Sequence, residues 1–285
     1  MSSLPPKVFD RERIAGHFAR RTGADDFVTA LALEDLATRL ITVTREFEAA
    51  LIIAPDARDL PVMGRSANGI FRFERAATVV ASEGAPLVDA EALALTRTDY
   101  DLIVSVLDLT VVNDVVGFLA RVRRHLRPDG LFMAVAIGGA SLNELREAWL
   151  SAEAEVMGGA SARVAPFIPL SDAGGLLQRA GFTLPVTDVE THTVRYGHPL
   201  RLMAELKALG AQNPLAERPA RPVTRKLLQA ATEAYGALAL DADARVRATL
   251  ELIWMSGWAP HESQQQPARR GSATVSLKDV LERKP

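Results

Sequence analysis

The chain has 285 residues, of which 48% are hydrophobic, and its formal net charge is −2. This length and composition allow a full core in one large domain, and the near-neutral charge predicts no nucleic-acid partner. Cysteine is absent, which excludes disulfides, thiolate zinc sites and cysteine nucleophiles. No apolar run approaches the roughly 18 residues that cross a bilayer, so no transmembrane segment is expected.

The start of the chain and its basic residues indicate a location. The first residues, MSSLPPKVFDRERIAGHFARR, lack the apolar centre of a secretory signal. Only five lysines stand among the 33 basic residues, an arginine bias that is typical of a GC-rich bacterial genome. We therefore expect a protein of the bacterial cytoplasm, and a position peripheral to the inner membrane stays open.

Hydrophobic periodicity predicts strands that alternate with helices along most of the chain. In chain order we expect a helix over 25–44, strands over 49–54, 76–82 and 101–109, a helix over 113–126, a strand over 131–137, helices over 141–157 and 171–182, an extended stretch over 184–196, helices over 199–209 and 222–239, and a strand over 246–255. Asn113 is the expected N-cap of its helix, and Pro128 with Gly130 predicts the turn after it. The alternation predicts an α/β fold with a doubly wound, mostly parallel, Rossmann-like sheet.

The strand expected over 49–54 lacks the loop that usually follows such a strand. Its alanine- and isoleucine-rich run, in the stretch EFEAALIIAPDARDLP, is typical of a buried strand of a parallel sheet. In nucleotide-binding α/β domains the first loop is glycine-rich, because only glycine lets the backbone approach the ligand closely. Here no glycine stands between Gly23 and Gly64, so a cofactor site at this point is either remodelled or lost.

Several longer motifs resemble one family of proteins. They are VFDR at 8–11, LRPDGLF at 126–132, GGASLNELR at 138–146, GGASARVAPF at 158–167, LLQRAGF at 176–182 and GWAPHESQQQPARRGSATVSL at 257–277. Together with YDLIVSVLDL and NDVVGFLARVRRHL, they resemble class I S-adenosylmethionine-dependent methyltransferases. More specifically, they resemble the mitochondrial complex I (NADH:ubiquinone oxidoreductase) assembly factor 5 family and its alphaproteobacterial relatives. The biotin-pathway malonyl-carrier-protein methyltransferases are more distantly similar.

This resemblance runs nearly end to end and implies how the chain is organised. Residues 1–45 would form an N-terminal helical segment, and 46–258 a methyltransferase-like domain with a helical insertion at about 197–240. Residues 259–285 would form an irregular C-terminal tail. The eukaryotic member is associated with hydroxylation of an arginine on a complex I subunit and with early assembly of that complex. A shared fold does not determine the reaction, so the activity stays open.

The chain departs from the family where the cofactor would bind. In the family the first strand ends in an aspartate followed by a glycine-containing loop. Here Ile53 and Ala54 end the expected strand, and Pro55 and Asp56 begin the loop. Pro55 removes one amide donor. Asp56 is either a substitute for the lost strand-end acid or a solvated loop carboxylate.

Two further acidic landmarks of the family's cofactor site fall at VVASEG and LVDAEAL. Ser82 stands where the resemblance places the carboxylate for the ribose hydroxyls, with Glu83 one residue beyond. Asp89 either keeps the adenine-side aspartate or is a turn residue before a helix. The degenerate cofactor site that the resemblance implies therefore comprises Ile53, Ala54, Asp56, Ser82, Glu83, Asp89, Ser105 and Leu107.

The strand over 101–109 should line the ligand cleft with its last residues, Ser105 to Asp108. Open α/β sheets bind their ligands at the carboxyl ends of the strands. The family continues this strand with a His-Trp pair, and this chain has Thr110 and Val111 instead. The cleft thereby loses an aromatic and a titratable side chain, and the sequence identifies no catalytic residue.

The histidines predict no metal site. A facial iron triad needs two histidines and a carboxylate, commonly with a close His-x-Asp/Glu pair. None of the five histidines begins such a pair: His17, His125, His192, His198 and His261. The sequence also has no G-x-S-x-G elbow and no Walker loop, so hydrolase and phosphate-loop NTPase functions are not predicted.

The tail stretch HESQQQPARRGSATVSL is the expected partner site. It is polar and is interrupted by proline and glycine, so it is a poor core segment. Such a segment either recognises a partner or closes a cleft, or it packs along a sheet edge and covers backbone groups. The candidate contact residues are His261, Glu262, Arg269 and Arg270, and the two arginines are expected to face an acidic partner surface.

These observations lead to three functional hypotheses. The first is a non-catalytic binding or assembly factor linked to respiratory complex I, with no cofactor and with a respiratory-complex subunit or small assembly protein as its partner. The second is an active methyltransferase or protein-arginine-modifying enzyme that binds S-adenosylmethionine through a remodelled loop. The third, weaker hypothesis is a cleft that has changed its ligand to an apolar one, because its expected wall is apolar.

Overall fold

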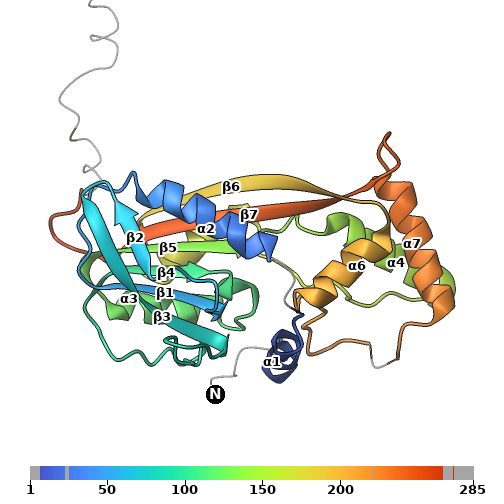
Figure 1. The fold of residues 1–285 in the computed structure, drawn as a ribbon, viewed down its shortest axis with the longest axis horizontal. Helices are drawn as coiled ribbons and strands as arrows, with labels where there is room; N and C mark the ends of the chain where they lie inside the picture. Colours follow the sequence, from blue (N-terminus) through green and yellow to red (C-terminus); the bar gives the residue numbers. More distant parts are fainter. Residues whose placement is uncertain (1–6, 23–25, 220, 266–271, 273–285) are drawn as a thin grey trace, which may run out of the picture.

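The computed structural model describes residues 7–22, 26–219, 221–265 and 272. They form a seven-stranded sheet in the order β2-β3-β1-β4-β5-β7-β6, with helices on both of its faces (Figure 1). The predicted α/β fold with a doubly wound, Rossmann-like sheet is confirmed, but the sheet is mixed and not mostly parallel, because β2, β6 and β7 pair antiparallel. Within the described ranges, none of the helices is both long and apolar enough to cross a membrane.

The elements alternate along most of the chain as the periodicity predicts. In chain order they are α1 (Arg11–Ala19), α2 (Phe27–Leu40), β1 (Ala50–Asp56), β2 (Met63–Ser66), β3 (Gly69–Val80), β4 (Tyr100–Val106), the 3₁₀ helix η1 (Asp108–Thr110), α3 (Val115–His125), β5 (Leu126–Ile137), α4 (Asn143–Met157), α5 (Leu170–Arg179), β6 (Thr183–Tyr196), α6 (Pro199–Ala208), α7 (Arg225–Ala239) and β7 (Val246–Trp258).

Parallel strands form the centre of the sheet and are buried on both faces. Strand β1 pairs with β3 on one side and β4 on the other, and β4 pairs with β5, all in parallel. Consecutive residues of a strand point to opposite faces. Ile53 accordingly lies in the core cluster that contains Phe118 of α3 and Leu177 of α5. Ile52 lies in the opposite cluster, which contains Leu36 of α2.

Strands β6 and β7 form a long antiparallel ribbon that leaves the sheet. They pair from Thr183 with Trp258 to Tyr196 with Val246, and Figure 1 shows the ribbon reaching a separate group of helices, α4, α6 and α7. We call these three helices the helical lobe. It has a core of its own, built around Tyr235. Helices α6 and α7 lie within 197–240, the range where the sequence predicts a helical insertion.

The segment after β1 differs from the prediction. Strand β1 continues to Asp56, so Pro55 and Asp56 end the strand and do not begin a loop. Proline has no N–H to donate, and it lies where the pairing register of β1 shifts, which is where a strand tolerates it. The expected strand over 76–82 is the second half of β3, which begins at Gly69 after a hairpin with β2.

Two local predictions around α3 were wrong. The N-cap of α3 is Asp114, whose carboxylate accepts a hydrogen bond from the Gly117 N–H at 2.8 Å. Asn113 instead bonds to the N-terminal segment, since its Oδ1 accepts from the Phe9 N–H at 2.8 Å. The turn expected at Pro128 and Gly130 is part of β5, because Gly130 keeps a partner there: its carbonyl accepts from the backbone N–H of residue 259 at 2.9 Å.

We expect Tyr235→Ala to lower the free energy of unfolding by about 3–5 kcal/mol, measured by urea denaturation. Tyr235 is fully buried in the helical lobe, and removing its ring leaves a cavity. The matched control is Tyr235→Phe, which removes only the hydroxyl that donates to the Arg247 carbonyl at 2.9 Å and should cost about 1 kcal/mol. A loss below 1 kcal/mol for Tyr235→Ala would mean that the helical lobe does not unfold together with the sheet.

Candidate functional site

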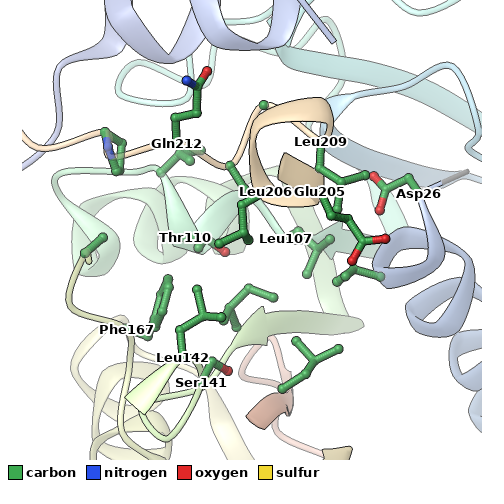
Figure 2. A pocket seen from close by; sticks show the side chains of 18 of the residues that line it. Asp26, Leu107, Thr110, Ser141, Leu142, Phe167, Glu205, Leu206, Leu209 and Gln212 are labelled. Atoms are coloured by element: carbon green, nitrogen blue, oxygen red, sulfur yellow. The ribbon is translucent and has the colours of Figure 1, made fainter. Parts of the chain in front are cut away.

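The carboxyl ends of β1, β4 and β5 border a cavity of about 250 Å³. Its other walls come from α1, the start of α2, α6, and the loop after α6 (Figure 2). The lining is mainly apolar, and Figure 2 shows Leu107, Leu142, Phe167 and Leu206 around it. Open α/β sheets bind their ligands at this edge, so this cavity is the candidate functional site.

The structure brings three of the eight expected cofactor-site residues to this cavity. Ala54, Asp56 and Leu107 line it. Ile53 is fully buried in the core beneath the edge and does not line it. Ser105 is also fully buried, and its hydroxyl is used inside the protein, as described below.

Asp56 is held by an ion-pair network at the end of β1. Its side chain is only 5% exposed, and its carboxylate lies 2.6 Å from the Arg58 guanidinium and 3.3 Å from that of Arg21. Arg21 is shared with Asp26, at 2.6 Å. The expectation of a solvated loop carboxylate is therefore corrected, because both guanidinium groups bind Oδ2 of Asp56 and the Arg58 backbone N–H donates to Oδ1.

The other three expected residues lie elsewhere, in the connection between β3 and β4. Ser82 forms a tight turn with Ala85, and Glu83 is exposed. Asp89 is exposed too, and its carboxylate accepts a hydrogen bond from the Glu91 N–H at 2.9 Å. Neither Ser82, Glu83 nor Asp89 lines the cavity. The expected cofactor site is thus not assembled as one group of side chains.

Arg11, which the sequence analysis did not single out, bridges the end of β3 and the segment after β4, on either side of β1 at the carboxyl edge of the sheet. Its guanidinium donates to the Thr78 carbonyl of β3 at 2.9 Å and to the Val111 carbonyl beyond β4 at 3.3 Å. Because β1 lies between β3 and β4, this side chain crosses the carboxyl end of β1. Phe9 and Ile14 flank it and pack in one cluster with Val111. The N-terminal segment therefore covers the point where the strand order reverses, which is where such sheets bind ligands.

Asp108 is a fully buried acid at the same edge of the sheet, just after β4. It opens η1 directly after Leu107, which has a left-handed backbone (φ +65°). Its carboxylate accepts hydrogen bonds from the Thr78 hydroxyl at 2.5 Å and from the Ser105 hydroxyl at 3.2 Å. Burial raises the pKa of Asp108 to about 7, an effect that these hydrogen bonds and the nearby Arg11 charge only partly offset.

Most polar side chains around the cavity form ion pairs or hydrogen bonds with one another. Arg163 pairs with Glu153 at 2.6 Å, and the Tyr196 hydroxyl donates to the carboxylate of Glu205. Glu205 has no cationic partner among the described residues. The Oγ1 atom of Thr110 is buried and has no hydrogen-bond partner in this part of the chain. Around the cavity, Glu205 is therefore a carboxylate without a cationic partner among the described side chains, and the unpaired Thr110 hydroxyl is buried within the wall.

The expected partner residues divide between the two parts of the tail. His261 and Glu262 are exposed, and His261 Nδ1 lies 2.7 Å from Ser263 Oγ. Arg269 and Arg270 lie outside the described residues. Just before them, Gln264 donates to a carboxylate oxygen of Asp129 at 2.9 Å, so the tail begins against the end of the sheet. Across the described ranges, no three histidine, aspartate or glutamate side chains gather as metal ligands would.

This chain is similar to a methyltransferase family model over a short stretch and to proteins named as arginine hydroxylases over most of its length. A family model described as "Methyltransferase domain" matches residues 72–134. "Arginine-hydroxylase NDUFAF5, mitochondrial" of Danio rerio is 35% identical over 194 residues, which cover 68% of this chain and 60% of that protein. The Homo sapiens protein of that name is 39% identical over 68% of this chain and 56% of its own length. These matches confirm the resemblance that the motifs predict.

Other similar proteins include methyltransferases and a cyclase. "Malonyl-[acyl-carrier protein] O-methyltransferase" of Halorhodospira halophila is 32% identical, covering 69% of this chain and 64% of that protein. Among solved structures, phosphoethanolamine N-methyltransferase 2 of Haemonchus contortus matches 87% of this chain and 57% of that one at 11% identity, with a TM-score of 0.40. The [4+2]-cyclase SpnF matches 91% and 99% at 12% identity, with a TM-score of 0.45. The chain spans less than two thirds of the curated relatives named above.

We expect Asp108→Asn to remove a pH dependence from stability. Between pH 3.8 and about 7 the unfolded chain releases this proton while the folded protein keeps it, so wild-type stability falls as the pH rises through that window. At about 1.4 kcal/mol per unit, urea denaturation should show the Asn variant gaining about 4 kcal/mol on the wild type between pH 4 and pH 8. The same substitution at the exposed Asp59 is the control. An equal stability difference at both pH values would contradict the assignment.

Proposed function

We propose that this methyltransferase-like protein has lost cofactor binding and works by binding a protein partner. The partner would be a respiratory-complex subunit or a small assembly protein, during assembly of respiratory complex I. The main observation in favour of a lost cofactor site is the connection between β1 and β3. The link to complex I rests on the resemblance described above.

The connection between β1 and β3 has no crossover helix. Residues 57–68 join these two parallel strands, and they hold the short strand β2. Parallel neighbours are usually joined by a helix, whose N-terminus presents free backbone N–H groups to an anionic or polar ligand. Here no helix begins at the end of β1, and Pro55 removes a further amide from that position. This supports the loss of the first half of a nucleoside-type site.

The Arg11 charge at the same edge also opposes the cofactor, whereas the Glu205 charge does not. S-adenosylmethionine carries a sulfonium cation, and the Arg11 guanidinium already crosses the end of β1. Asp56, which could have replaced the lost strand-end acid, is occupied by Arg21 and Arg58. Like charges repel most strongly where water is excluded. We infer from these contacts that the residues present do not fit S-adenosylmethionine.

The alternative function is an active enzyme with a remodelled cofactor loop. It is favoured by the names of the similar proteins, which are an arginine hydroxylase and a carrier-protein methyltransferase. It needs a cofactor orientation that avoids the Arg11 side chain and the ion pairs of Asp56. The two functions therefore differ in one measurable property, the affinity for S-adenosylmethionine.

We expect no measurable heat of S-adenosylmethionine binding in calorimetry at micromolar protein. Charged hydrogen bonds to a ligand contribute roughly 1.5–3 kcal/mol each, and losing two of them weakens binding on the order of 10²–10⁴-fold. A micromolar dissociation constant for this cofactor or its demethylated product would refute the proposal and support the enzyme. Arg11→Met keeps the apolar stem and should also fail to bind, because the loop stays unchanged. Binding by Arg11→Met alone would make Arg11 the single obstacle.

We expect the double substitution Arg269→Glu and Arg270→Glu to weaken partner binding about tenfold or more, and to lower the amount of assembled complex I on native gels. Each reversal replaces an attraction to an acidic surface of up to about 1 kcal/mol with a repulsion. Arg124→Glu with Arg179→Glu is the control, since both arginines are exposed on α3 and α5 and the charge change is equal. Equal assembly in both variants, with unchanged melting temperatures, would exclude the tail arginines from the partner site.

A further inference from the structure

We propose that the cavity at the carboxyl edge binds a neutral aliphatic molecule that carries one hydrogen-bonding group, a hydroxyl or a carbonyl. The inference concerns the cavity alone and does not depend on whether the protein has lost its cofactor. It follows from three features of the cavity: its apolar walls, the pairing of its cations, and one free hydroxyl.

The apolar walls face one another across the cavity. Leu107 and Val111 come from the sheet edge, whereas Leu206 and Leu209 come from α6, and Phe167 comes from the loop before α5. Figure 2 shows Phe167 and the α6 leucines on different sides of the same space. Burying each methylene of a ligand between such walls is favourable, in proportion to the area removed from water. The walls therefore suit an aliphatic chain better than a polar nucleoside.

The cations at the cavity are not available to an anionic ligand. Arg21 is bound by Asp26 and Asp56, and Arg163 is bound by Glu153. Glu205 also lines the cavity, and within the described ranges no cation neutralises it. In Figure 2, Glu205 and Asp26 lie on the same side of the cavity. A carboxylate or phosphate head group would meet repulsion there, which disfavours fatty acids relative to uncharged molecules of the same length.

Thr110 supplies the hydrogen-bonding group that the ligand would meet after a rotation of this side chain, because Oγ1 is buried within the wall. Its Oγ1 atom is buried, has no partner among the described residues, and belongs to a residue that lines the cavity. Buried polar atoms are nearly always hydrogen-bonded, so an unpaired hydroxyl in an apolar wall indicates a missing partner. A hydroxyl or carbonyl on an otherwise aliphatic molecule satisfies it without introducing charge.

The first experiment measures chain-length dependence by titration calorimetry of the full chain with 1-hexanol, 1-octanol and 1-decanol. Each added methylene should tighten binding about fourfold until the cavity is full. Decanoate at pH 8 should bind about tenfold or more weakly than 1-decanol, because of the Glu205 charge. Affinity that does not change with chain length, or decanoate that binds as tightly as decanol, would overturn the proposal.

Three variants locate the ligand. Thr110→Val keeps the shape of the side chain and should weaken decanol binding about fivefold by removing the hydroxyl. Leu206→Trp fills the cavity and should abolish binding, whereas Leu206→Ala enlarges it and should move the affinity plateau to longer alcohols. Leu200→Trp, at an exposed position on the same helix, is the control and should bind as the wild type does. If Leu206→Trp fails to fold, Leu206→Ala decides: an unchanged plateau would place the alcohol outside this cavity.

Discussion

Strands β1 and β3 are parallel neighbours joined without a helix. The packing at the carboxyl edge of the sheet depends on this connection. The backbone carbonyls of residues 78 and 111 lie at this edge, on β3 and after η1. The Arg11 guanidinium bonds to both carbonyls, because buried acceptors need a donor. That contact draws α1 over the edge, and α1 becomes one wall of the cavity.

Charge pairing then determines how polar the surface of the cavity is. Arg21 is matched by the carboxylates of Asp26 and Asp56, since an unpaired buried charge is costly. Arg11 instead bonds to backbone carbonyls. Asp108 meets the same constraint differently, because its raised pKa lets it become neutral. With these groups occupied, the surface left to a ligand is mainly apolar.

The family-like motifs and the altered loop fall on opposite sides of this cavity. The motifs at 138–146 and 158–167 supply lining residues such as Leu142 and Phe167, at the end of β5 and before α5. The altered stretch over 54–58 lies at the end of β1. Two of the family-like motifs thus reach the cavity, and the altered stretch contributes another part of its wall. A change of ligand and the loss of one are both consistent with this distribution.

The sequence by itself determined the order of most strands and helices, the doubly wound sheet and the absence of a glycine loop after β1, because periodicity and turn residues are local. It did not reveal the β2–β3 hairpin, the role of Arg11 or the burial of Asp108. These depend on contacts between distant residues: Phe9 meets Asn113 across 104 positions, and Arg11 meets Thr78 across 67. Only the tertiary structure decided that the expected cofactor residues separate, because hydrogen bonding and burial at the sheet edge depend on which segments the fold brings together.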